Sequence, residues 1–335
     1  MGHRRPVRPF AVLIAALVAG CAARAPVPPT WEQAGSWEHH HVDVPDRVDG
    51  APLRMHYLAA GDPDAPRVVL LHGFPDTSFG WRDVLPALAS EYRVLAPDMR
   101  GYAGTDRPRT GYDRATLAAD IAAFIAATNE ADDVAADTRV HLLTHDWGSA
   151  TGWWVATMHG ERLLTFTATS AAHPKAFADF LAQDREQRRR AGYQGFFGSP
   201  GAPGVFASFT HRQLARAYHG AMHRPEVMPD ELVDIYAATF RTVADWRPPL
   251  RYYADLARDA GDMQAAIASA PPVRVPTLVL WGEHDTYLFA RQAPLSCEYV
   301  AARCEVEVFA DAGHHVHWDA PGSLVARWRA FVAEH

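Results

Sequence analysis

The sequence predicts an α/β fold, with a mostly parallel, doubly wound sheet and a block of helices inserted into it. Short apolar runs bounded by Gly, Pro and Asp alternate with helical segments, as expected when strands are buried on both faces. This alternation stops between residues 173 and 272, where helical periodicity continues without a clear strand. The 335 residues are 48% hydrophobic and 21% charged, which excludes a disordered chain.

The predicted strands follow one another along two separate parts of the chain. Two alternating stretches precede six apolar runs, at 41–44 and 53–58, and then at 68–71, 93–96, 140–143, 164–168, 277–280 and 306–309. We therefore expect a catalytic domain made of residues 38–172 and 273–335, with a helical lid at 173–272. Helices inserted after the run at 164–168 would cover the carboxyl edge of the sheet, where ligands bind.

The first residues predict export. Arg4, Arg5 and Arg8 precede an apolar run at 10–20 that is too short to span a bilayer, which makes residues 1–20 a signal peptide. Small residues directly before Cys21 resemble a bacterial lipobox, in which Cys21 would become the lipidated first residue. The alternative is an ordinary secretory signal cut after 23–25. Residues 21–37 are predicted to be a tether, and the protein a cell-envelope lipoprotein (periplasmic or outer surface), otherwise a secreted protein.

The net charge limits the classes of binding partner, and the cysteines allow a disulfide. The formal charge is −7, and removal of residues 1–20 takes away three Arg and no acid, leaving −10. An acidic chain is not expected to bind nucleic acid, and its membrane attachment would come from the lipid anchor. Cys297 and Cys304 lie seven residues apart and could form a disulfide in an oxidising compartment, or could be two buried thiols.

A strand that runs into a tight turn and a helix identifies the candidate nucleophile. Asp146 follows the run at 140–143, with Thr144 two residues before it and Gly148 two residues after it. Small neighbours at these positions are typical of the nucleophile elbow, usually written G-x-S-x-G, which exposes the central side chain above the sheet. An Asp that merely caps the following helix is the alternative.

Two further groups follow later strands. Asp285 comes just after the run at 277–280, and His314 lies in a loop after the run at 306–309. The order of nucleophile, acid and His resembles that of the α/β-hydrolase superfamily, over residues 38–335. An Asp nucleophile is most similar to the epoxide hydrolase and haloalkane dehalogenase branch. His314 fits the family's loop, with Gly before it and Pro seven residues after it, whereas His315 and His317 are expected to be packing or rim residues.

The resemblance implies a mechanism without a cofactor. Asp146 would attack a saturated carbon to form an alkyl ester, which water activated by His314 would hydrolyse while Asp285 orients that imidazole. The backbone N–H groups of Phe74 and Trp147 would stabilise the oxyanion, and the Phe74–Pro75 peptide is expected to be cis.

The resemblance also implies that lid tyrosines open the ring. Tyr193 and Tyr253 fall on the matching positions, although Tyr252 competes with Tyr253 and either residue could serve packing alone. The expected partners are a small apolar epoxide and the water that converts it to a diol. The epoxide should contact the two tyrosines and also Phe74, Trp147 and Gln194. Four further aromatic residues could line an apolar cavity or could belong to the core: Phe196, Phe197, Trp153 and Trp246.

Other activities fit less well. A haloalkane dehalogenase would use the same three groups, but Phe74 offers no side-chain donor to a halide. A haloacid dehalogenase would carry Arg at the positions of Trp147 and Ala150. An esterase would place its nucleophile in the turn, whereas Ser149 lies past the turn. A non-catalytic binding lipoprotein of this fold would be expected to lack one of the three groups. No metal is expected, because three consecutive histidines at 39–41 alternate sides on a strand.

Overall fold

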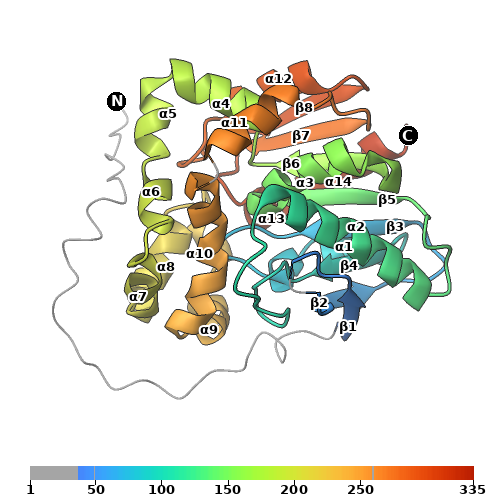
Figure 1. The fold of residues 1–335 in the computed structure, drawn as a ribbon, viewed down its shortest axis with the longest axis horizontal. Coiled ribbons are helices and arrows are strands. Elements are labelled where there is room, and N and C mark those ends of the chain that lie inside the picture. Colours follow the sequence, from blue (N-terminus) through green and yellow to red (C-terminus); the bar gives the residue numbers. More distant parts are fainter. Residues whose placement is uncertain (1–36, 49, 259) are drawn as a thin grey trace.

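An eight-stranded sheet forms the centre of the molecule (Figure 1). The structure is a computed structural model that describes residues 37–48, 50–258 and 260–335. The predicted signal peptide, Cys21 and all of the predicted tether but Trp37 lie outside these residues. Among the described residues, no helix has both the length and the apolarity required to cross a bilayer.

The sheet has the order β1-β2-β4-β3-β5-β6-β7-β8. Its strands are β1 (Glu38–Val44), β2 (Leu53–Ala60), β3 (Arg67–Leu71), β4 (Arg93–Pro97), β5 (Val140–His145), β6 (Leu163–Thr169), β7 (Thr277–Gly282) and β8 (Cys304–Phe309). β2 pairs antiparallel with β1 and β4, and all other neighbours are parallel. The predicted mixed, mostly parallel α/β sheet is therefore confirmed.

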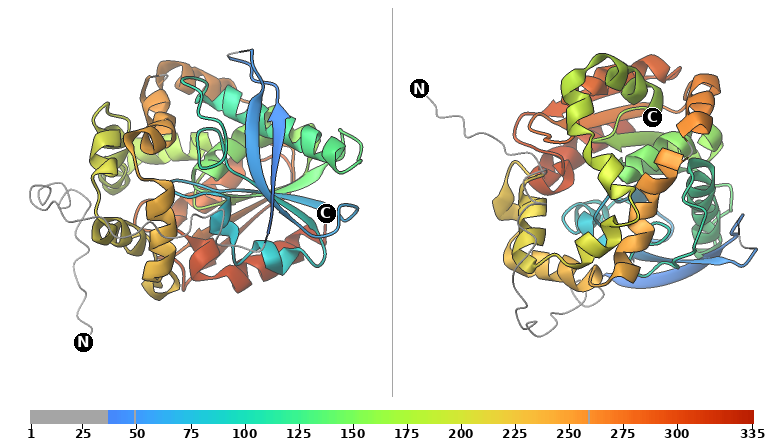
Figure 2. Two further views of the ribbon diagram at one scale, coloured as in Figure 1. Left: turned by 90° about the horizontal axis from the view of Figure 1, so that it is seen from below. Right: turned by 60° about the vertical axis from the view of Figure 1, so that its left-hand side comes forward.

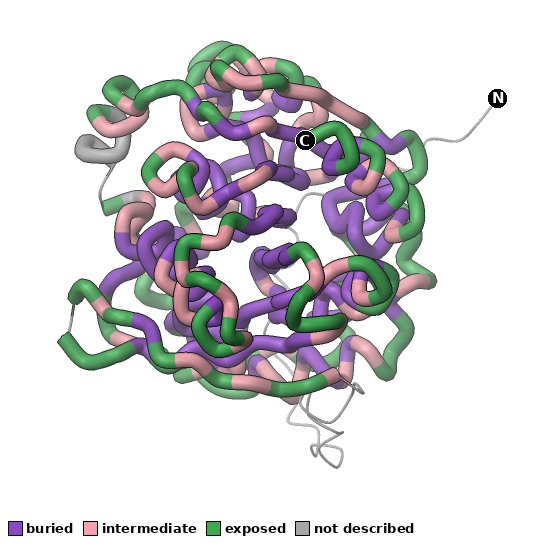
Figure 3. Tube along the Cα trace, turned by 90° about the vertical axis from the view of Figure 1, so that its right-hand side faces the viewer, coloured by how far each residue is buried: buried purple, intermediate pink, exposed green. Residues whose placement is uncertain are grey.

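Helices cover both faces of this sheet, which is why its central strands are buried apolar runs. α2 (Arg114–Ala131) and α3 (Trp147–Met158) lie over one face, and α1 (Leu85–Leu88) and α14 (Pro321–Val332) over the other (Figure 2). Every residue of β3 and of β7 is buried, and the buried part of the chain lies in the interior of the trace in Figure 3. The carboxyl ends of the parallel strands thus emerge from a layer that is buried on both faces.

The helical insertion lies between β6 and β7 and covers one end of the sheet, on the left in Figure 1. Its helices are α4 (Pro174–Gln183), α5 (Arg185–Arg190), α6 (Tyr193–Phe197), α7 (Ala202–Ala207), α8 (His211–His219), α9 (Asp230–Thr239), α10 (Val243–Arg258) and α11 (Ala260–Ser269). We call this insertion the cap. No strand occurs among its described residues, as the helical periodicity predicts.

One covalent link joins the start of the last strand to the segment before it. Cys297 and Cys304 form a disulfide, the first of the two alternatives that their spacing allowed. The bond closes a short loop next to β8, the edge strand farthest from β1.

Candidate active site

Asp146 lies on a strained turn between β5 and α3. Its φ of 50° and ψ of −117° are rare for a residue with a side chain, and such strain is typical of a nucleophile elbow. A Cβ on Gly148 would lie 2.3 Å from the carbonyl oxygen of Leu71, so the turn requires glycine there. Thr144 fits the other small position because its hydroxyl donates to the Thr167 carbonyl at 2.7 Å. The Asp146 side chain makes no capping hydrogen bond to the described helix, which argues against the capping alternative.

A backbone donor holds one oxygen of this carboxylate. The Phe74 N–H donates to Asp146 Oδ1 at 2.8 Å, and the Phe74–Pro75 peptide is cis. A Cβ on Gly73 would lie only 2.5 Å from Asp146 Cβ, so the loop can approach the nucleophile because residue 73 is glycine. Trp147 is the first residue of α3, where backbone N–H groups lack intrahelical partners.

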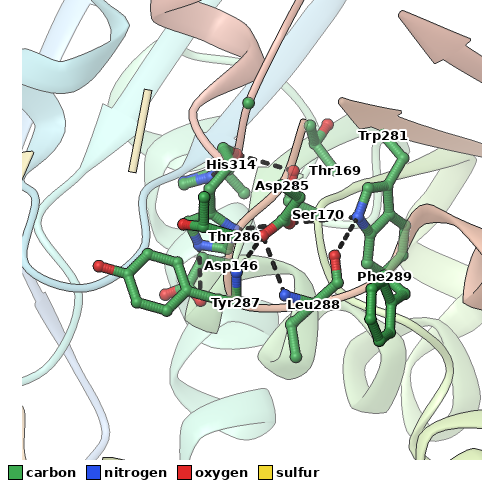
Figure 4. A network of polar contacts seen from close by, with 12 residues as sticks. Asp146, Thr169, Ser170, Trp281, Asp285, Thr286, Tyr287, Leu288, Phe289 and His314 are labelled. Atoms are coloured by element: carbon green, nitrogen blue, oxygen red, sulfur yellow. Dashed lines mark hydrogen bonds and ion pairs between the residues drawn. The ribbon is translucent and has the colours of Figure 1, made fainter. Parts of the chain in front are cut away.

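His314 connects Asp146 to Asp285 (Figure 4). Its Nδ1 lies 2.8 Å from Asp285 Oδ2, and its Nε2 lies 3.4 Å from Asp146 Oδ2. The Asp285 carboxylate also accepts hydrogen bonds from the backbone of Tyr287 and Leu288, at 2.8 and 2.9 Å, and from the Trp281 indole at 3.1 Å. Asp285 is thereby fixed in place, and it fixes the imidazole in turn.

Electrostatics make the resting site an ion pair. Burial alone would lower the pKa of His314, but the carboxylates of Asp285 and Asp146 raise it to about 10. Burial would raise the pKa of Asp146, yet the hydrogen bond and the charge of His314 hold it below the usual value. At neutral pH, an Asp146 carboxylate therefore faces a His314 imidazolium.

Two cap phenols complete the site. Tyr193 begins α6 and Tyr253 lies on α10, with their ring centroids 6.3 Å apart. Burial raises the pKa of both phenols, and the negative charge of Asp146 raises it further, so both remain protonated donors at neutral pH. The competitor Tyr252 instead donates its hydroxyl to the Arg100 carbonyl at 2.9 Å.

A cavity of about 360 Å³ opens onto Asp146 and the two cap phenols. Asp146, Trp147, Gln194, Tyr193 and Tyr253 all line it, as expected from the sequence. Its mostly apolar wall also includes Tyr252, Leu117, Ala150, Trp154, Phe177, Leu181, Leu256, Ile267 and Leu288. A second cavity of about 430 Å³ is lined by cap residues and shares Leu181, Gln194, Tyr253 and Leu256 with the first.

The cavity wall differs from expectation at Phe74. Phe74 is not among the described lining residues, because its ring is buried against Phe197 and Tyr253, with centroids 5.5 and 5.2 Å away. The four other aromatics, for which core and cavity were both open, are also absent from the described lining. Trp153 and Trp246, for instance, are buried at 0% and 1% exposure and belong to the core.

Residues 66–321 match the family described as alpha/beta hydrolase fold. Over 295 residues the chain is 31% identical to epoxide hydrolase 3 of Xenopus tropicalis, an alignment that covers 86% of this chain and 77% of that protein. The chain belongs to the α/β-hydrolase fold family, in its epoxide hydrolase-like branch.

Further comparisons agree with this assignment. The hydrolase is 29% identical over 321 residues to epoxide hydrolase A of Mycobacterium tuberculosis, covering 85% of this chain and 96% of that protein. A crystal structure of Bacillus megaterium epoxide hydrolase in complex with an inhibitor shares the fold, with a TM-score of 0.73 at 20% identity, over 88% of this chain and 100% of that one.

One aromatic group of this α/β hydrolase was not predicted from the sequence. The ring of Tyr287 lies 5.2 Å from that of His314 and 5.4 Å from that of Tyr193, measured between centroids. Its position two residues after Asp285 was the available signal.

Ser149 is correctly set aside, since its hydroxyl donates to the Thr169 carbonyl at 2.9 Å inside the core. His315 and His317 are 2% and 0% exposed, so they are packing residues, and the alternative that they lie at the rim of the site is wrong.

Proposed function

We propose that this α/β hydrolase is an epoxide hydrolase, which converts an epoxide to a vicinal diol. The observation that carries the proposal is the pair of neutral phenols, Tyr193 and Tyr253, that line the same cavity as the Asp146 carboxylate. A carboxylate can displace a leaving group from saturated carbon, and a phenol can protonate the alkoxide that forms. The names of the relatives support the same chemistry.

In the first step, Asp146 opens the ring. Oδ1 is held by the Phe74 N–H, so Oδ2 is the oxygen that attacks an epoxide carbon. The carbon–oxygen bond of the ring breaks, and the alkoxide takes a proton from Tyr193 or Tyr253. The product is a hydroxyalkyl ester of Asp146, together with one phenolate.

Formation of this ester activates His314. The ester has no charge, so one of the two carboxylates that raise the pKa of His314 to about 10 is lost. The imidazolium then returns a proton to the phenolate and becomes the general base. It deprotonates water, which attacks Cγ of Asp146, and the Phe74 N–H stabilises the oxyanion. The acyl–oxygen bond breaks, the diol leaves with the proton of the new carboxyl group, and the resting ion pair is restored.

A single turnover in ¹⁸O-labelled water tests the proposal. Excess protein reacts with a styrene-oxide-type epoxide, and the peptide that contains Asp146 is analysed by mass spectrometry. We expect ¹⁸O in Asp146 and unlabelled oxygen in the first diol, because water attacks the ester carbonyl. Absence of the label from Asp146 would rule out the covalent route. In a parallel assay with a bromoalkane, halide release that exceeds diol formation would favour a dehalogenase.

We also propose that the protein is exported and anchored to the membrane by lipid on Cys21. The N-terminal pattern supports this, as does the Cys297–Cys304 disulfide, since such bonds persist in oxidising compartments. A Cys21→Ser variant should move from the membrane fraction to the soluble fraction. Identical fractionation of the variant and the parent would contradict lipidation.

A further inference from the structure

Three buried histidines that the proposed reaction does not use lie next to the catalytic residues. His145 ends β5 directly before Asp146, and His315 and His317 follow His314 in the chain. One ring nitrogen from each of the three lies within 4.8 Å of the others. The three side chains are fully or almost fully buried.

Hydrogen bonds fix the tautomers of two of these rings. His145 Nε2 lies 2.9 Å from the carbonyl oxygen of His314, which can only accept, so Nε2 carries the proton. His317 Nε2 lies 3.3 Å from Asp76 Oδ2, to which it donates in the same way. Each ring is left with a bare lone pair on Nδ1. Metal-bound histidines almost always donate their other N–H to a carbonyl or a carboxylate, as these two do.

The Nδ1 atoms of all three rings have no hydrogen-bond partner in the part of the chain that the structure describes. Nδ1 of His145, of His315 and of His317 is buried without a hydrogen bond. An unpaired polar atom in such a place costs free energy, and three together call for an occupant. A water molecule can donate to two ring nitrogens and accept from a third that is protonated, whereas one cation accepts a lone pair from each of the three, so metal binding distinguishes the two occupants.

The charges around the cluster allow a cation. Burial lowers the pKa of all three histidines, so they are neutral, which is the form that binds metal. The Arg82 guanidinium lowers the pKa of His315 and His317 further and would oppose a cation as well. Two acids oppose Arg82: Asp76 contacts His317, and Asp146, whose pKa His314 holds low, adjoins His145. Burial raises the pKa of Asp76, so Asp146 is the stronger of these two negative charges.

We propose that His145, His315 and His317 bind one divalent first-row metal ion, with Zn²⁺ as the expected occupant. Three nitrogens within 4.8 Å of one another surround a point that is at most about 2.8 Å from each, against about 2.0–2.1 Å for a Zn–N bond. Side-chain movements of less than about 1 Å would therefore complete the bonds. Three imidazoles are ligands suited to Zn²⁺, Ni²⁺ or Cu²⁺ rather than to Mg²⁺ or Ca²⁺.

Such an ion would connect the two catalytic segments of the sheet edge. It would link the residue before the nucleophile to the loop that carries His314, and so hold these segments in register. The ion would have a positioning role, because none of its three ligands is among the residues that line the reaction cavity.

The test is metal binding by the whole chain. Protein freed of metal with a chelator is titrated with Co²⁺, and visible absorption of the folded parent reports nitrogen coordination directly, without any substitution. We expect one Co²⁺ per chain, displaced by one Zn²⁺, and a rise of a few degrees in the unfolding midpoint at about a hundredfold excess of Zn²⁺ over Kd. The variants His315→Gln and His317→Gln should each lose most of this binding.

Two control variants separate this site from others. His141→Gln removes another buried histidine of β5, whose Nδ1 lies 2.8 Å from the Thr165 hydroxyl. His223→Gln breaks an exposed pair in which the rings of His223 and His284 stack at 4.0 Å. Both controls should keep the stoichiometry of one. The proposal is overturned if the parent binds no Co²⁺, or if binding survives in both cluster variants or is lost in His223→Gln.

Discussion

At the carboxyl edge of the sheet, Asp285 accepts three hydrogen bonds from its own loop and from Trp281, and Asp146 is held by the Phe74 N–H. In the cap, by contrast, the two phenols pack mainly against aromatic rings, and each has a hydrogen-bonding side chain beside it, Gln194 for Tyr193 and Trp147 for Tyr253. Tyr253 lies edge-on to Trp147, with centroids 5.0 Å apart, and Tyr193 packs on Phe197 at the same distance.

Hydrogen bonds fix both distance and direction, whereas aromatic contacts tolerate a range of offsets and angles. The sheet edge is therefore a rigid reaction centre, and the cap is a wall that can adjust to the shape of a substrate. This difference predicts that a change at the sheet edge costs more activity than a comparable change in the cap.

The largest effect is expected for His314→Gln. The variant keeps the nucleophile and the cap phenols but has no base for hydrolysis of the ester. Ester hydrolysis should slow by about 1000-fold or more while ring opening continues, so the alkylated protein accumulates. Intact-protein mass spectrometry after one turnover should show the adduct. If steady-state turnover falls and no adduct appears, His314 is not the base of the second step.

A smaller effect is expected for Gly73→Ala. The new methyl group would lie 2.7 Å from Asp146 Oδ1, where backbone and nucleophile cannot both keep their places. Loss of the Phe74 donor should lower kcat by about 100- to 1000-fold. Gly195→Ala in the cap is the matched control, because a Cβ there meets nothing within 4 Å. Equal losses in the two variants would show that the sheet edge is not the more sensitive region.

The cap phenols should have the smallest effects on rate. Tyr193→Phe and Tyr253→Phe should each slow ring opening by about 10- to 100-fold, since the other phenol remains, and should leave ester hydrolysis nearly unchanged. Stopped-flow measurements separate the two steps. Tyr252→Phe is the control, because its hydroxyl is bound to the Arg100 carbonyl. Slowing of both steps to the same degree would remove the acid role from the two phenols.

The same division explains what the sequence could predict. The strands and Asp146, Asp285 and His314 were predictable, because short apolar runs end in loops whose residues meet at one edge of a parallel sheet. Tyr193 and Tyr253 needed the family resemblance, since nothing in their local pattern separates them from Tyr252.

Contacts between distant segments were beyond the sequence. The ring of Tyr287 reaches His314 because of the path of the loop after β7, and His145 meets His317 only because β5 and α13 (Val316–Asp319) lie together, with ring centroids 4.3 Å apart. The sequence also left the cavity wall undecided, since aromatic residues are equally suited to a core and to a cavity until their packing is known.

The two regions should also differ in the pH at which they stabilise the fold. The pKa of His314 is about 10 in the folded protein and about 6.5 in an unfolded chain, so the folded state holds the extra proton between these values. The stabilisation is complete below about pH 6.5 and is lost as the pH rises toward 10, at up to about 1.4 kcal/mol per pH unit. Burial of Tyr193 and Tyr253 raises their pKa above 10, so the cap loses stability only at higher pH.

Urea unfolding at several pH values separates the two contributions. Between pH 7 and 9.5, the free energy of unfolding of the parent should fall more steeply than that of His314→Gln, and Tyr253→Phe should follow the parent. Above pH 10 the free energy of unfolding of the parent should fall more steeply than that of Tyr253→Phe, because the phenols of the unfolded chain ionise while the buried ones do not. A His314→Gln variant with the same slope as the parent between pH 7 and 9.5 would mean that the resting site is not an ion pair, and the activation of His314 by ester formation would lose its basis.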